Sequence, residues 1–161
     1  MGIVAFHIVL FVLPFLIVFW EARRRQFQQG EFSYLLLLYF LLFGVGVQAL
    51  VTGLVQIFIG EGHSEYVNRP WSPYVWEVGM MNLSYAAIAF LCIWLRGSFW
   101  AAVGLGYSIF LFLAFIGHMY EVAFHYNYSL GNIGPQVWID LATGIVLCCL
   151  ILRRQQKMDT E

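Results

Sequence analysis

Residues 107–125 read YSIFLFLAFIGHMYEVAFH, an apolar run that ends with two histidines and a glutamate. A run this apolar is typical of a helix that crosses a bilayer, which takes about 20 residues. On such a helix His118, Glu121 and His125 would share one face, because they stand at positions i, i+3 and i+7. They are candidates for metal ligands, for a proton relay, or for a polar rim where the helix meets water.

The composition extends this interpretation to the whole chain. Of the 161 residues, 61% are hydrophobic and 11% are charged, whereas soluble domains have about 45–50% and about 25%. A soluble fold cannot bury that much apolar surface, so we expect an all-α integral membrane protein whose main partner is the lipid bilayer. The net charge of −1 and the lack of a basic face give no support for nucleic-acid binding.

Five apolar segments are long enough to cross a bilayer. They are residues 3–20, 34–59, 73–95, 99–124 and 135–152. The third begins at a clear helix signal, because serine suits the N-cap position and proline the first helical position, as in Ser72-Pro73. The segments predict a five-transmembrane-helix bundle that forms one transmembrane domain over residues 1–161.

The basic residues predict the orientation of this bundle. The first apolar segment has no positive region before it and EARRR after it, so we expect it to be retained as a span rather than cleaved. With five spans, seven of the eight basic residues fall on one side, and only Arg69 falls on the other. Because basic residues favour the cytoplasmic side, the N-terminus is expected outside and the C-terminus in the cytoplasm of a bacterial inner membrane. The seven are Arg23, Arg24, Arg25, Arg96, Arg153, Arg154 and Lys157.

Polar residues inside the spans gather toward the predicted outer side, and every span contributes to them. They are His7, Gln48, Thr52, Gln56, Glu77, Asn82, His118, Glu121, Gln136 and Asp140. Ionisable groups in a membrane usually face the bundle interior or a water-filled cavity, because exposure to lipid is costly. Asn82 lies about 140° around a helix from Glu77, so one surface is not expected to hold both.

Three functions fit this polar set. The first is an outer-facing intramembrane cavity that binds a small polar ligand, ion or proton. Its lining would be Glu77, Asn82, His118, Glu121 and Asp140. The second is a structural or accessory subunit of a larger membrane complex or homo-oligomer. There the polar groups would only join helix ends, with Glu77 bonded to His118 and Asp140 to Tyr120 or Asn132.

The third function is a small membrane metalloprotein. A divalent metal would be held by His118, Glu121 and Glu77, residue types that suit zinc or iron. Haem is a weaker alternative, since its axial histidines would be His7 and His118 and no spacing indicates that pair. The sequence contains no nucleophile elbow, phosphate loop or dinucleotide fingerprint, so no catalytic residue is assigned and enzymatic activity stays an open question.

The longest predicted outer loop, residues 60–72, contains Glu61, His63 and Glu65. This loop is either a lid over the cavity or a solvated loop. Its polar composition favours the solvated loop.

Short segments over residues 70–150 resemble a family of small, functionally uncharacterised prokaryotic membrane proteins. The resemblance rests on a Ser-Pro before Glu-x-Gly, a following Asn, a Gly-His near the end of the next span, and Gly-Asn-x-Gly before an Asp-bearing last span. Here these are Ser72-Pro73, Glu77-Val78-Gly79, Asn82, Gly117-His118, Gly131-Asn132-Ile133-Gly134 and Asp140. The resemblance implies a polytopic membrane protein and offers no biochemical function.

Overall fold

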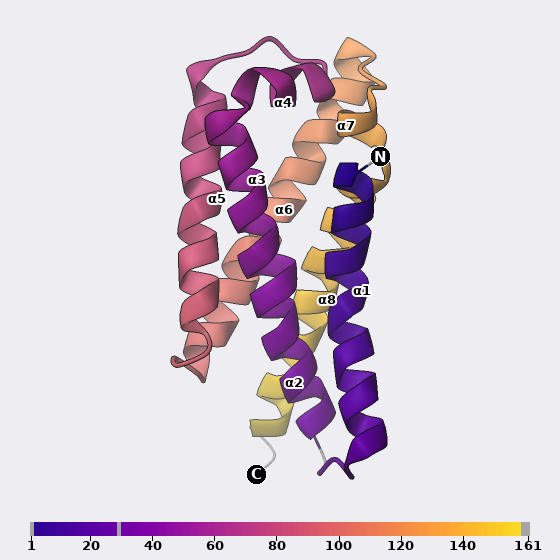
Figure 1. Ribbon diagram of the computed structural model, residues 1–161, viewed down its shortest axis with the longest axis vertical. Coiled ribbons are helices and arrows are strands. Elements are labelled where there is room, and N and C mark those ends of the chain that lie inside the picture. The colour runs from indigo at the N-terminus through magenta and orange to yellow at the C-terminus, as the bar shows by residue number, and fades with distance from the viewer. Residues whose placement is uncertain (1, 29, 159–161) are drawn as a thin grey trace.

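The protein is a bundle of long helices (Figure 1). The computed structural model describes residues 2–28 and 30–158, and this part of the chain contains helices and no strands. The long helices are α1 (Gly2–Arg24), α5 (Pro73–Leu91), α6 (Ser98–His125) and α8 (Pro135–Met158). A continuous segment joins α2 (Glu31–Tyr39), the π-helix η1 (Phe40–Val47) and α3 (Gln48–Phe58). The short helices α4 (Gly60–Tyr66) and α7 (Leu130–Ile133) lie together at one end, here called the α4–α7 end.

Four helical segments are long and apolar enough to cross a membrane. They are Val4–Arg24, Glu31–Phe58, Ser98–His125 and Leu130–Arg154. The protein is therefore an α-helical membrane protein, as its composition predicted. The fifth expected span forms α5, which has 19 residues but is not among these four. Glu77 and Asn82 lower its apolar character, and the chain leaves the helix after Leu91 rather than at residue 95.

Helices α3 and α5 pack closely because each presents a glycine to the other. A Cβ atom added at Gly53 would lie 2.8 Å from the carbonyl oxygen of Gly79, and one at Gly79 would lie 2.8 Å from Ile57. Small residues allow such close approach between membrane helices. The start of α5 is as predicted, since the Ser72 side chain accepts a hydrogen bond from the Tyr74 backbone N–H at 3.2 Å.

Helices α6 and α8 form a second close pair. A Cβ atom at Gly104 would lie 2.7 Å from Ile151, and one at Gly144 would lie 2.9 Å from Phe112. By contrast, α5 and α6 contact each other little, although residues 92–97 connect them directly. In Figure 1 they meet near this connection and separate toward the α4–α7 end.

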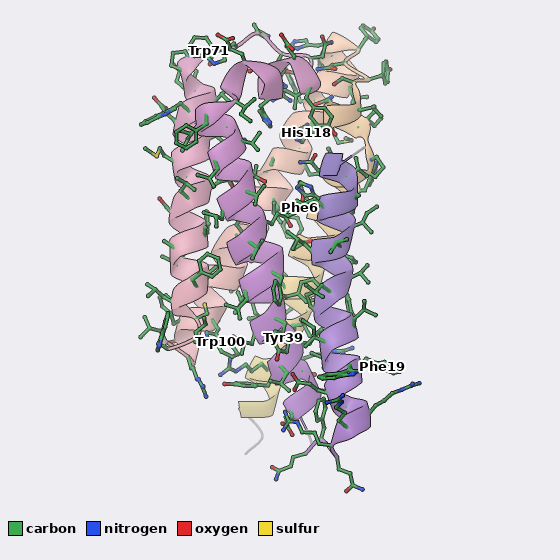
Figure 2. The ribbon with its side chains drawn as sticks, viewed as in Figure 1. Phe6, Phe19, Tyr39, Trp71, Trp100 and His118 are labelled. Carbon is green, nitrogen blue, oxygen red and sulfur yellow. The ribbon has the colours of Figure 1, made fainter. Side chains whose placement is uncertain are left out.

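The best-packed part of the interior lies toward the end opposite α4 and α7. Trp100, Phe40 and Leu41 are fully buried there, and the Trp100 indole N–H donates to the backbone oxygen of Cys92 at 2.8 Å. Figure 2 shows Trp100 and Tyr39 toward this end and His118 toward the other. The pair of α3 and α5 and the pair of α6 and α8 thus pack against a shared apolar core at one end and lie further apart at the other.

Candidate functional site

A cavity of about 490 Å³ lies where the helices spread, next to α4. Its walls come from α3, α5, α6 and α8, and residues 63–72 cover it together with Gly131 of α7. Its polar lining is Gln48, Thr52, Gln56, His63, Ser64, Arg69, Asn82, His118, Gln136 and Asp140. Most of the polar residues that the sequence assigned to one depth therefore line a single cavity.

Two side-chain hydrogen bonds organise the part of the cavity that lies deepest in the bundle. The Gln48 amide donates to the Asp140 carboxylate at 2.6 Å, which joins α3 to α8. The Asn82 amide donates to the Gln56 oxygen at 2.9 Å, which joins α5 to α3. Gln48, Thr52 and Gln56 form one stripe along α3 because they are four residues apart. These bonds hold amide and carboxyl groups in place within an otherwise apolar bundle.

Asn132 is the centre of the network that covers the cavity. This residue is fully buried, and its side-chain oxygen lies 2.8 Å from Nδ1 of His118 and 3.3 Å from the Arg69 guanidinium. Its amide donates to the backbone oxygens of Asn127 at 2.7 Å and His118 at 3.3 Å. One asparagine of α7 therefore fixes the position of a histidine on α6 and an arginine after α4.

A second asparagine ties the two outer segments to each other. The Asn127 amide donates to the backbone oxygens of Val67 at 2.9 Å and Asn68 at 3.2 Å. Gly131 permits close contact between α7 and the end of α4, because a Cβ atom at this position would lie 2.6 Å from the backbone oxygen of Tyr66. The interpretation of residues 60–72 as a solvated loop is wrong, since they form α4 and a packed connection over the cavity.

The cavity entrance combines an arginine, a glutamate and several histidines. The Arg69 Nε atom lies 3.8 Å from the Glu121 carboxylate, which also lies 3.3 Å from Nδ1 of His125. His63 lies 3.5 Å from the Gln56 amide. Burial lowers the pKa of His63 below its ordinary value of 6.5, and nearby His118 and Arg69 lower it further. The fold thus holds His63 in its neutral form beside a permanent cation.

Several buried polar atoms of residues that line the cavity lack a hydrogen-bond partner. They are the Arg69 Nε, the Ser64 and Tyr66 hydroxyl oxygens, and the Gln136 side-chain oxygen. Buried polar groups in native proteins are almost always satisfied by protein, water or ligand. Water or a bound ligand would supply the missing partners.

The sequence-predicted site residues divide into three groups. Asn82, His118 and Asp140 line the cavity. Glu121 does not line it, but its carboxylate faces Arg69, which does. Glu77 is exposed on the outside of α5, apart from the lining, while Asn82 of the same helix is buried, as their angular separation predicted. The partners also differ from those expected, since His118 bonds to Asn132 and Asp140 to Gln48.

The predicted metal ligands are not brought together. Among the described residues, no group of three or more His, Cys, Asp or Glu side chains could hold a metal ion. The set His118, Glu121 and Glu77 fails because Glu77 points away from the bundle. His7, the other histidine of the alternative haem pair, lines a neighbouring hollow with Phe6, Val51 and His63, whereas His118 lines the main cavity.

Sequence reasoning missed several residues that build the site. Arg69 was not among the predicted site residues, Asn132 was expected to bond to Asp140 rather than to His118 and Arg69, and His63 was placed in a solvated segment. One signal was available for Arg69, because it is the single basic residue on its side of the predicted membrane. For Asn132 the signal was its place between Gly131 and Gly134, whose backbones pack too tightly for a side chain.

Together these features define an α-helical membrane protein with a cavity at one end of its bundle that several polar side chains line. The chain belongs to DUF6790, a family of unknown function, which it matches over residues 4–160. The resemblance to an uncharacterised family, seen over residues 70–150, is thus confirmed over nearly the whole chain. No match was found among curated proteins or among solved structures.

Proposed function

We propose that this protein is a binding protein of the bacterial inner membrane whose cavity takes up a polar ligand, ion or proton from the outer side. In this proposal the chain is one transmembrane domain of five crossings, and α5 is the fifth. Its 19 residues give a length of about 28 Å, close to the hydrocarbon thickness of about 30 Å. Its contact with α3 at Gly53 and Gly79 keeps it inside the bundle.

The distribution of charge supports the orientation. Arg23, Arg24 and Arg25 end α1 at the end opposite the cavity, and Arg153 and Arg154 lie near the C-terminal end of α8. The Arg24 guanidinium lies 3.7 Å from the centre of the exposed Trp20 ring, a pairing typical of a membrane interface. Lys157, also expected on this side, has a side chain outside the described part of the structure. Basic residues at this end favour a cytoplasmic position for it and an external position for the cavity.

The observation that carries the proposal is the set of unpartnered polar atoms around the cavity. The Arg69 Nε, the Ser64 and Tyr66 hydroxyl oxygens and the Gln136 side-chain oxygen are buried and have no hydrogen-bond partner. A hydrogen-bonded polar cap without a ligand would be expected to satisfy its own groups, because an unsatisfied buried group costs about 1–3 kcal/mol. Binding of water or a ligand would restore these bonds, so this arrangement favours a binding site over a purely structural one.

Cysteine accessibility tests whether the cavity is open to water from outside. Thr52→Cys and Leu54→Cys are a matched pair on α3, since Thr52 lines the cavity and Leu54 is exposed on the outer surface at a similar depth. Both are made in a background where Cys92, Cys148 and Cys149 are alanine. A membrane-impermeant thiol reagent added to intact cells should label Thr52→Cys and not Leu54→Cys. If neither is labelled while Glu65→Cys is, the cavity is closed to water and the proposal fails.

The same background tests the orientation and the accessory-subunit alternative. Glu65→Cys should react in intact cells, whereas Gln28→Cys should react only after permeabilisation, and the reverse pattern would invert the orientation. An accessory subunit would instead co-purify with a partner. Its association with that partner would persist after His118→Ala and Asp140→Asn.

A further inference from the structure

The cavity opens sideways as well as toward the α4–α7 end. Val78 of α5 and Leu113 of α6 both line it, yet 38% and 63% of their surface is exposed. Both lie well inside their helices, where the surrounding medium is hydrocarbon. This opening exists because α5 packs on α3 and α6 packs on α8, and the two pairs separate toward α4 (Figure 1). A molecule in the outer leaflet therefore has a direct route between α5 and α6.

An aromatic cluster forms the lower limit of this opening. The Tyr85 ring of α5 lies 5.2 Å from the Tyr107 ring and 5.8 Å from the Phe110 ring of α6. Beyond this cluster the space between the same helices continues as a second hollow of about 360 Å³, lined by Met81, Ile88 and the small residues Ser84, Ala102 and Gly106. The walls along this route are apolar, so they suit a hydrocarbon chain.

The top of the cavity has the opposite character. Arg69 is a permanent cation, and two of the unpartnered buried atoms there, on Ser64 and Tyr66, belong to hydroxyl groups that can donate hydrogen bonds. The titratable neighbours are His63, His118, the Glu121 carboxylate at 3.8 Å from Arg69, and the more distant Asp140, which is bonded to Gln48. An arginine cation beside hydroxyl groups that can donate hydrogen bonds fits an anionic oxygen acceptor such as phosphate.

We propose that the ligand is a phospholipid whose phosphate headgroup has a net negative charge, and that it enters from the bilayer between α5 and α6. Its headgroup lies beneath Arg69 and accepts hydrogen bonds from the Arg69, Ser64 and Tyr66 side chains. Its chain leaves through the opening between Val78 and Leu113. This inference rests on the proposed function, because it names the class of ligand that the same cavity binds. It explains why one cavity combines an arginine and hydrogen-bonding side chains at its roof with an apolar side opening.

Photo-crosslinking tests the inference directly. The full-length protein is reconstituted in phosphatidylcholine vesicles that contain phosphatidic acid with a photoreactive group on its acyl chain. Crosslinked peptides should include Val78 or Leu113. Leu113→Trp should reduce this labelling about tenfold by filling the opening, whereas Ile116→Trp, exposed on the same helix outside the lining, should not. Arg69→Gln should reduce labelling by a similar factor and Arg69→Lys by less, because a charged hydrogen bond is lost in the first and partly kept in the second.

Two results would overturn the inference. One is equal labelling by photoreactive phosphatidylcholine, whose headgroup has no net charge. The other is unchanged labelling in Leu113→Trp when that variant elutes as wild type in size-exclusion chromatography. Glycerol phosphate, which has the headgroup without chains, separates the two proposals. If it raises the melting temperature as much as phosphatidic acid does, the ligand is a water-soluble anion, and the cavity function stands while the lipid inference falls.

Discussion

Arg25 and Arg69 lie at opposite ends of the bundle and have different surroundings. Arg25 contacts the carboxylates of Glu21 at 3.2 Å and Glu31 at 2.5 Å, and the Tyr39 hydroxyl donates to the same Glu21 at 2.7 Å. Arg69 has one carboxylate at 3.8 Å and one amide oxygen at 3.3 Å, and its Nε has no hydrogen-bond partner. Arg25 thus has two carboxylate partners within 3.2 Å, whereas Arg69 has a more distant carboxylate and an Nε without a hydrogen-bond partner.

The interior shows the same contrast. Around Trp100 the space is filled by aromatic and aliphatic side chains, with the Tyr34 ring 4.8 Å away and the indole N–H bonded to Cys92. Around His118 the helices separate and amide side chains replace apolar ones. Tight packing at one end supplies the stability that allows the other end to remain open. Substitutions at the two ends should therefore differ in kind as well as in size.

The largest effect is expected from Trp100→Ala. Trp100 is fully buried in the packed end, and removal of a buried tryptophan costs about 3–5 kcal/mol of unfolding free energy. Unfolding in detergent micelles titrated with a denaturing detergent measures this change. Trp76→Ala is the matched control, because Trp76 is about half exposed on α5 and its loss should change stability by less than about 0.5 kcal/mol. Equal losses in the two variants would contradict the assignment of the core to this end.

Asn132→Ala should have the next largest effect, at the cavity end. Its removal leaves Nδ1 of His118 and the Arg69 guanidinium without their acceptor, at a cost of about 1–3 kcal/mol. Tyr128→Ala in the same connection removes an exposed ring and should cost little. Adding His118→Ala to Asn132→Ala should cost less than the two single changes summed, because the residues share one hydrogen bond. Additive losses would show that Asn132 is not the centre of this network.

Much of the fold could be predicted because bilayer spans leave a strong pattern in sequence. The apolar runs, the Ser72-Pro73 helix start and the stripe of Gln48, Thr52 and Gln56 depend only on local order along the chain. The same local geometry separated Asn82 from Glu77. These predictions succeeded because helix period and helix start are determined within a few residues.

The rest depended on contacts between distant segments. Asn132 meets Arg69, 63 residues earlier, and Asn127 meets Val67, 60 residues earlier. Loop sequences do not specify such pairings, so α4 looked like a solvated loop and the expected partners of His118 and Asp140 were wrong. The polar pattern picked out residues of several helices that line one cavity, but not which helix faces enclose it, and that is why Glu77 was included.

A smaller effect is expected from lowering the pH at the cavity end. Folding lowers the pKa of His63 below 6.5, through burial and through the nearby His118 and Arg69. Below pH 6.5, His63 is therefore protonated more readily in the unfolded chain than in the folded protein. The contribution of His63 to the free energy of unfolding is therefore constant above about pH 6.5 and decreases as the pH drops below it. One proton limits this decrease to ~1.4 kcal/mol per pH unit.

The melting temperature measured from neutral pH to about pH 5 tests this effect. His63→Gln should flatten the acidic part of the curve, because it removes the group whose pKa burial lowers. A wild-type curve that rises as the pH falls would contradict the buried, neutral state of His63.

The smallest effect is expected from Glu77→Gln, and it sharpens the contrast between the inside and the outside of one helix. Glu77 is exposed on α5 and lines no part of the cavity, so its loss should change stability by less than about 0.5 kcal/mol and leave lipid crosslinking unchanged. Asn82→Ala, five residues later, removes the amide that donates to Gln56 and should cost about 1 kcal/mol while altering crosslinking in the cavity. If Glu77→Gln had the stronger effect on crosslinking, the ligand would bind the outer surface of α5, and the cavity would not be the site.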